Sequence, residues 1–122
     1  MKIVITAVLI GALAGLAGAL LGVGGGIIMV PAFTKILGLE QKNAVATSLA
    51  IIVITAGIGT SYHITKKTEL IDWKLVGFAA VAAAVAAWLG SDLMRSLSSV
   101  HLKRIFGIVL VLVGVQMLFL KK

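Results

Sequence analysis

The chain has 122 residues, of which 61% are hydrophobic and only 12% are charged, and its mean hydropathy is +1.19. A water-soluble protein of this size needs more polar residues to cover its core, so the composition predicts a single integral membrane domain over residues 1–122. The net charge of +7 does not indicate nucleic acid as a partner, because the basic residues stand singly or in pairs beside apolar segments and suit the headgroups of a lipid bilayer.

Residues 3–21 form the first predicted transmembrane helix. An apolar run of this length crosses a bilayer core of about 30 Å at about 1.5 Å per residue. A signal peptide is the alternative, since Met1 and Lys2 precede an apolar run with small residues. The run is longer than a signal core, which favours a membrane helix. Gly11 and Gly15 are four residues apart, as are Gly18 and Gly22, and this spacing of small residues is typical of helices that pack closely.

The rest of the chain is organised around a glycine-rich segment, Gly22-Val-Gly-Gly-Gly-Ile-Ile-Met-Val-Pro31. Each glycine costs a helix about 1 kcal/mol relative to alanine, and Pro31 removes a backbone donor, so the segment predicts a helix break. Inside a membrane such a break is tolerated only where protein or a watery cavity covers the freed backbone groups. Two interpretations stay open at this point, a tight turn between spans and a binding site.

After the break, Ile27 restarts a helix whose first amides have no partner within it and carry partial positive charge. This helix start is a candidate site for an anion. The helix is predicted over residues 27–37, which gives a length of roughly 16 Å and is too short to cross the membrane. We therefore expect a half-helix or re-entrant segment.

The next span is predicted over residues 44–64, with Asn43 as its N-cap. Thr47 and Ser48 lie near the start of this span, and their hydroxyl groups could face the same pocket as the half-helix start. The alternative for each hydroxyl is a hydrogen bond to its own helix backbone. His63 is interpreted as an interfacial residue, with a role as a proton relay as the alternative.

Two further spans are predicted over residues 75–93 and 105–120. A charged loop over 66–74, with Trp73 as an interfacial anchor, precedes the first, and a basic turn over 98–104 precedes the second. Residues 79–87 are nearly all small, which predicts burial among other helices. The expected fold class is all-α, with about four transmembrane helices plus one short half-helix.

The basic residues give almost no bias toward one orientation in the membrane. With four spans, six of them (Lys2, Lys66, Lys67, Lys74, Lys121, Lys122) oppose five (Lys35, Lys42, Arg95, Lys103, Arg104). If the half-helix also crosses, Lys2, Lys35, Lys42, Arg95, Lys103 and Arg104 oppose the other five. Because many transporters consist of two inverted repeats, we expect a homodimer, antiparallel rather than parallel, in which each subunit supplies one glycine break.

Motifs of other functional classes do not fit this sequence. Gly22 and Gly24 begin no dinucleotide fingerprint, because Ile27 occupies the position of its third glycine and no strand precedes it. The sequence has no cysteine and two distant histidines, so neither a metal nor a cofactor is expected. The span centres hold no nucleophile paired with a base, and we therefore expect no enzymatic activity.

The order of several motifs resembles the TauE/SafE family of sulfite exporters and sulfonate permeases. The resemblance is carried by the glycine-rich segment, by Ala44-Val-Ala-Thr-Ser-Leu49, Ile71-Asp-Trp73 and Trp88-Leu-Gly90, and by Leu102-Lys-Arg-Ile-Phe-Gly107 with Gly114. It covers nearly the whole chain but only one of the two repeats of typical members. It therefore implies half of an inverted-repeat transporter.

The resemblance implies a permease of the prokaryotic inner or plasma membrane that moves small anions, such as sulfite, thiosulfate or sulfoacetate. The candidate substrate-binding residues lie in the glycine-rich segment and at the following helix start: Gly22, Gly24, Gly25, Gly26, Ile27, Pro31, Thr47 and Ser48. Two alternatives stay open. The chain could be a packing subunit that carries nothing within a larger complex, or a dual-topology ion channel of another family.

Overall fold

The computed structural model describes residues 1–66 and 69–119, which form five α-helices joined by short connections. They are α1 (Lys2–Leu21), α2 (Gly26–Lys35), α3 (Gln41–Thr65), α4 (Trp73–Ser96) and α5 (Ser99–Phe119). Four of these helices are long and apolar enough to cross a membrane, and α2 is the shorter apolar helix. The predicted fold class is therefore confirmed. Lys67, Lys121 and Lys122, which entered the charge count, lie outside the described residues.

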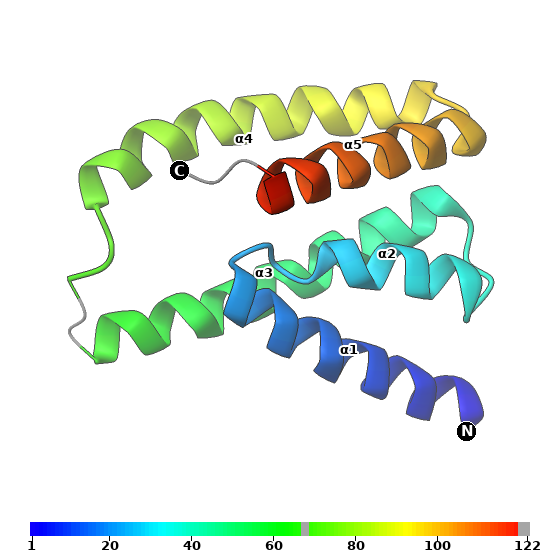
Figure 1. Cartoon of the computed structure of the whole chain (residues 1–122), viewed down its shortest axis with the longest axis horizontal. Coiled ribbons are helices and arrows are strands. Elements are labelled where there is room, and N and C mark those ends of the chain that lie inside the picture. The colour runs from blue at the N-terminus through cyan, green and yellow to red at the C-terminus, as the bar shows by residue number, and fades with distance from the viewer. Residues whose placement is uncertain (67–68, 120–122) are drawn as a thin grey trace.

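The helices α1 and α2 form a hairpin that turns at the glycine-rich segment (Figure 1). Gly22 ends α1 with φ 70° and Gly25 begins α2 with φ 77°. Both values lie in the left-handed region, which glycine enters without steric penalty. Gly24, between them, has φ 66°, so the predicted break is confirmed and three of its glycines are required by the backbone geometry of the turn.

The hairpin is closed by direct contact between the two backbones. A Cβ atom added to Gly18 would lie 2.7 Å from the amide nitrogen of Gly25, and one added to Gly25 would lie 2.5 Å from the carbonyl oxygen of Ala14. Gly11 and Gly15 belong to the same run of glycines in α1, but they face open space. Close packing, which the spacing predicted for the whole run, is therefore concentrated at Gly18.

Two predicted helix starts are wrong. Helix α3 begins at Gln41, with Glu40 rather than Asn43 as its N-cap residue and without a side-chain cap. Glu40 takes this position because its backbone is extended and its carbonyl oxygen accepts from the amide of Ala44 at 2.9 Å. Helix α5 begins at Ser99, so most of the predicted basic turn is helical. The hydroxyl of Ser98 accepts from the amide of His101 at 3.4 Å and supports this early start.

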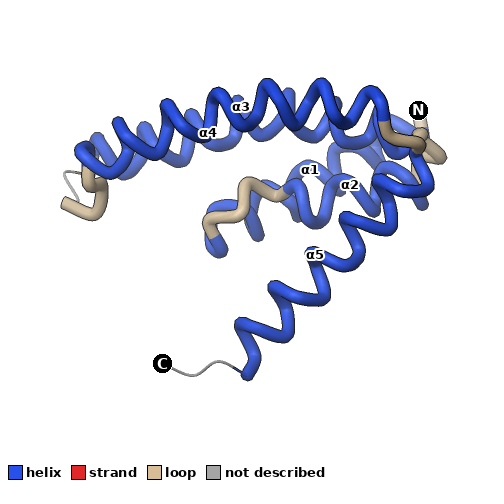
Figure 2. The backbone as a smooth tube through the Cα atoms, turned by 90° about the horizontal axis from the view of Figure 1, so that it is seen from above, coloured by secondary structure: helices blue, strands red, loops and turns tan. Residues whose placement is uncertain are grey.

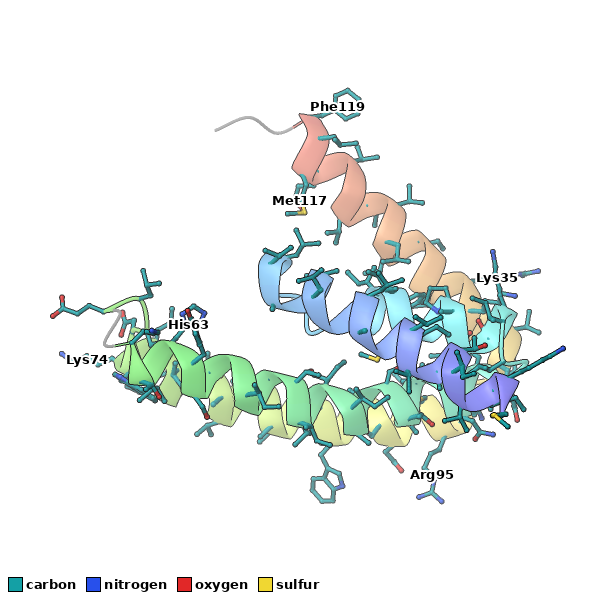
Figure 3. All side chains as sticks on the ribbon, turned by 90° about the horizontal axis from the view of Figure 1, so that it is seen from below. Lys35, His63, Lys74, Arg95, Met117 and Phe119 are labelled. Atoms are coloured by element: carbon teal, nitrogen blue, oxygen red, sulfur yellow. The ribbon has the colours of Figure 1, made fainter. Side chains whose placement is uncertain are left out.

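The N-terminus and the connections other than the α1–α2 turn divide between two ends of the molecule. The N-terminus, the α2–α3 connection and the α4–α5 turn share one end, whereas the α3–α4 connection lies at the other (Figure 1). Figure 3 places Lys35 and Arg95 at the first of these ends and Lys74 and His63 at the opposite one. For the described basic residues, this arrangement matches the second of the two groupings counted from the sequence, in which the half-helix also crosses the membrane.

The buried core is small and connects α1, α2 and the start of α3; its apolar members are Ile10, Ala14, Met29, Val30, Phe33 and Ala44. By contrast, α4 and α5 contain no buried residue. Figure 2 shows α5 diverging from the other helices towards its end, and Met117 and Phe119 stand clear of them in Figure 3. The small residues 79–87 are exposed, so their predicted burial is wrong for a single chain, in which α4 makes few contacts with other helices.

Candidate functional site

The glycine break lies beside the middle of α3. A Cβ atom added to Gly24 would be 3.1 Å from Cγ2 of Ile52, and one added to Gly26 would be 3.0 Å from Cδ1 of the same side chain. Ile52 is near the midpoint of the 25-residue α3. The turn between α1 and α2 is therefore located at mid-length of the longest helix, away from either end of the molecule.

Two cavities adjoin this turn. The first, here called the Gly18 cavity, has a volume of about 470 Å³ and lies between the hairpin glycines and the second half of α3. The second, the Ser48 cavity, has a volume of about 390 Å³ and lies between α2, the first half of α3 and α5. Each cavity is large enough to hold a small anion with part of its hydration shell.

One face of α3 lines both cavities. Gln41, Val45, Ser48 and Ile52 follow one another at intervals of three or four residues along the Ser48 cavity. From Ile52 the same spacing continues along the Gly18 cavity through Thr55, Gly59 and His63. Residues at this spacing share one side of a helix. The face therefore runs past the glycine break from near one end of α3 to near the other.

The structure separates the predicted site residues into three groups. Gly22 and Gly24 line the Gly18 cavity, whereas Gly26, Ile27 and Ser48 line the Ser48 cavity. The remaining three line neither of these two cavities. Gly25 is buried against α1, Pro31 is half-buried inside α2, and the side chain of Thr47 is exposed.

The first two residues of α2 line the Ser48 cavity, and their amides precede the first hydrogen bonds of the helix. The amides of Ile28 and Met29 both donate to the carbonyl oxygen of Gly25, at 3.1 and 3.0 Å. Within the described part of the chain, the amides of Gly26 and Ile27 have no acceptor. Both residues line the cavity, and the helix dipole places partial positive charge at this end. These groups can donate hydrogen bonds to an anion.

Ser48 adopts the alternative left open by the sequence. Its hydroxyl donates to the carbonyl oxygen of Ala44 at 2.7 Å, and the residue is almost fully buried. Ser48 can donate to a ligand in the cavity only by rotating away from this acceptor. Thr47, one position earlier on the helix, points about 100° away from it and leaves the shared face.

Sequence reasoning missed Gln41, because the predicted span begins only after Asn43. The residue is only 5% exposed, and its Nε2 atom is buried with no hydrogen-bond partner among the residues that the structure describes. Gln41 lines the Ser48 cavity at the end away from Ile52. A buried amide group without a partner is costly in a folded protein. The spacing of Gln41 to Ser48, which puts both on one side of a helix, was the available signal.

The Gly18 cavity has a more polar border along α3. Thr55, Thr60 and His63 line it, and the hydroxyl of Thr55 donates to the carbonyl oxygen of Ile52 at 3.2 Å. The ring of His63 is in edge contact with that of Tyr62, at 5.8 Å between centroids. This histidine lies near the end of α3, as the interfacial interpretation requires, and it also borders the cavity.

Comparison with known proteins gives a family and two curated relatives. A family model described as "Sulfite exporter TauE/SafE" matches residues 2–121. The "Probable membrane transporter protein YunE" of Bacillus subtilis (strain 168) is 32% identical over 117 residues, which are 93% of this chain and 39% of that protein. The "Probable membrane transporter protein YjnA" of the same organism is 30% identical over 124 residues, which are 97% of this chain and 46% of that protein.

The chain thus spans less than half the length of each of these two relatives. No solved structure matches it. The matches run over almost all of this chain, so more than half of each relative lies outside the matched part.

Proposed function

Because the chain belongs to the sulfite exporter TauE/SafE family, we propose that it is half of a permease for small anions, of the sulfur oxyanion or organosulfonate type. The observation that carries this proposal is that Gly26 and Ile27, whose amides have no acceptor among the described residues, line a cavity beside the middle of α3. Sulfite, thiosulfate and sulfoacetate offer several acceptor oxygens and negative charge to such donors. The expected location is the prokaryotic inner or plasma membrane.

In the proposed bound state, the anion loses part of its water and accepts hydrogen bonds from the amides at the start of α2. Charge-assisted hydrogen bonds of this kind are stronger than neutral ones. The Ser48 hydroxyl turns from Ala44 towards the anion as a further donor. Thr47 lies on an exposed face of α3, so it contributes only where a second half of the transporter covers that face.

The membrane potential can drive this transport without a coupling ion. An inside-negative potential of about 100 mV favours outward movement of a dianion by about 4.6 kcal/mol, at ~2.3 kcal/mol per charge. Export therefore needs no ionisable relay at the site. Uptake would require another driving force, such as a gradient of the substrate.

The second half is proposed to be another copy of this chain in the opposite orientation. Two observations support this arrangement: the unburied helices α4 and α5, and the near balance of basic residues between the two sides. An inverted pair would bring two glycine breaks to one shared path.

Fixing the orientation tests the antiparallel pair. Added lysines in the α3–α4 connection should drive every chain into one orientation by the positive-inside bias, and anion flux into liposomes should then be lost. Adding the same lysines to only half of the chains, by coexpression with the original protein, should restore flux. Full flux from a population held in one orientation would contradict the antiparallel arrangement.

Gln41→Met is expected to lower anion flux by about threefold to tenfold, because the variant removes one neutral donor, worth about 0.5–1.5 kcal/mol, from the Ser48 cavity. The same change should leave the protein equally stable or more stable, since it also removes a buried group without a partner. Flux into liposomes and thermal unfolding in detergent measure the two effects. Unchanged flux with higher stability would mean that Gln41 does not contact the substrate.

The function itself is tested with purified protein in liposomes loaded in turn with sulfite, thiosulfate, sulfate, sulfoacetate and a short carboxylate. We expect saturable flux of at least one sulfur-containing anion that depends on the protein and responds to the membrane potential. Protein that moves none of them and copurifies with a larger membrane partner would instead be a packing subunit. A passive, selective conductance that does not saturate would indicate an ion channel.

A further inference from the structure

The Gly18 cavity and the Ser48 cavity meet at a pair of apolar side chains. Val23, in the hairpin turn, and Ile52, on α3, line both cavities. Every other residue that α3 contributes to the Ser48 cavity precedes Ile52, and every other residue that it contributes to the Gly18 cavity follows Ile52. The two cavities are therefore arranged end to end along one face of α3, with Ile52 at the junction.

At this junction, the side chain of Ile52 lies directly against the glycine break. Its Cγ2 atom would be 3.1 Å from a Cβ atom on Gly24, and its Cδ1 atom 3.0 Å from one on Gly26. These separations are too short for ordinary side-chain contact, so the absence of side chains at the two glycines lets the isoleucine approach the turn. A half-buried aliphatic group thereby lies between two cavities that carry polar groups on their walls.

We propose that Ile52 is the apolar barrier that separates the two cavities and controls the passage of the anion past the glycine break. The identity of the transported solute rests on the proposed function, whereas the barrier rests on the geometry of the cavities. A hydrophobic constriction of this kind excludes water, so a hydrated anion cannot pass until the side chain moves. Gly24 and Gly26 then serve a second purpose, because they leave room for the isoleucine to close the path.

The first test measures which positions water-soluble reagents reach. The chain has no cysteine, so single cysteines report without a background. In permeabilised vesicles, a small anionic thiol reagent should label Val45→Cys and Ala56→Cys about tenfold faster than Ile52→Cys, because each of the first two lines one cavity, whereas Ile52 lies at the proposed barrier where the cavities meet. Val53→Cys provides the unreactive control, because its exposed apolar face is expected to lie against lipid, where the water-soluble reagent does not reach it.

Equal labelling at Ile52→Cys and in the two cavities would overturn the barrier. Cavity cysteines as unreactive as Val53→Cys would overturn it as well, because the barrier requires water on both sides. This result does not depend on transport. If the wild-type protein moves no anion, the proposed function fails and the labelling rates alone decide whether the barrier exists.

The second test measures anion flux in liposomes. Ile52→Ala should raise the protein-dependent leak of the anion by about tenfold, because the shorter side chain leaves space for water at the junction. Ile52→Leu, a separate variant that keeps the apolar volume, should have the wild-type leak rate, and Val53→Ala should also leave this rate unchanged. Flux through Ile52→Ala that equals flux through Val53→Ala would contradict the proposal.

Discussion

We expect Gly25→Ala to lower the free energy of unfolding by at least about 3 kcal/mol, because two independent costs combine at this residue. The φ angle of 77° is unfavourable for alanine by about 1–2 kcal/mol. The added Cβ would also lie 2.5 Å from the carbonyl oxygen of Ala14, a backbone atom that cannot move unless α1 separates from α2. Thermal unfolding of purified protein in detergent measures the loss.

Three neighbouring glycines separate these two costs. Gly22→Ala has the unfavourable φ angle but open space, so a loss of about 1–2 kcal/mol is expected. Gly18→Ala has the close approach without the positive φ, since its Cβ would lie 2.7 Å from the amide nitrogen of Gly25. Gly15→Ala has neither and should gain up to about 1 kcal/mol. If Gly25→Ala were no less stable than Gly22→Ala, backbone contact would not hold the hairpin together.

Ile27→Asp is expected to reduce anion flux by at least about a hundredfold, and by more for a dianion, while leaving the start of α2 intact. A carboxylate in the first turn of a helix stabilises that turn by about 0.3–1 kcal/mol. At roughly 5 Å from a bound anion, however, it repels each negative charge by about 3 kcal/mol at an effective dielectric constant of about 20. A free-energy difference of this size corresponds to a factor of about one hundred in binding.

The matched control is Ile27→Asn, which has nearly the same shape and no charge. Its flux should stay within about threefold of the wild-type rate, since it adds only a neutral polar group beside the amides. Size-exclusion chromatography in detergent checks that both variants insert and fold to the same extent. Equal flux through the aspartate and asparagine variants would mean that the anion does not pass close to the start of α2.

The hairpin and its unpaired amides could be predicted from the sequence because both follow from local rules. Three adjacent glycines interrupt a helix whatever surrounds them, and a helix that restarts must leave its first amides unpaired. The helix starts at Asn43 and after the basic turn were predicted less well. Asn43 is a favourable capping residue, but the extended backbone at Glu40 begins the helix earlier. The cluster of charges indicated a turn, but the cap at Ser98 begins the helix before it.

Which residues of α3 line each cavity depends on how the helix is rotated about its own axis. The predicted helix start at Asn43 did not define this rotation. Thr47 and Ser48 are adjacent, so only one of them can lie on the face that Gln41 and Ile52 share. The role of Ile52 was not visible in the sequence, because an isoleucine in a membrane helix carries no signal of its own. Contact with Gly24 and Gly26 distinguishes it from the exposed Val53.

The open faces of α4 and α5 could not be predicted from composition. A helix rich in small residues is suited to close packing, but the sequence of one chain does not specify whether the neighbour belongs to the same chain. In this chain, α4 contains no buried residue. The small residues over 79–87 are thus available to a second half of the transporter, in keeping with the proposed pair.

The most direct test of the central claim is an NMR titration of isotope-labelled protein in detergent with thiosulfate and sulfite, in which the amide signals of α2 are followed. We predict saturable downfield shifts of the Gly26 and Ile27 amide protons, the largest in the chain, because hydrogen bonds to an anion deshield their donors. Both signals should stay in place when a neutral solute replaces the anion. Unchanged Gly26 and Ile27 signals in protein that still transports the anion would contradict the claim that these amides bind it.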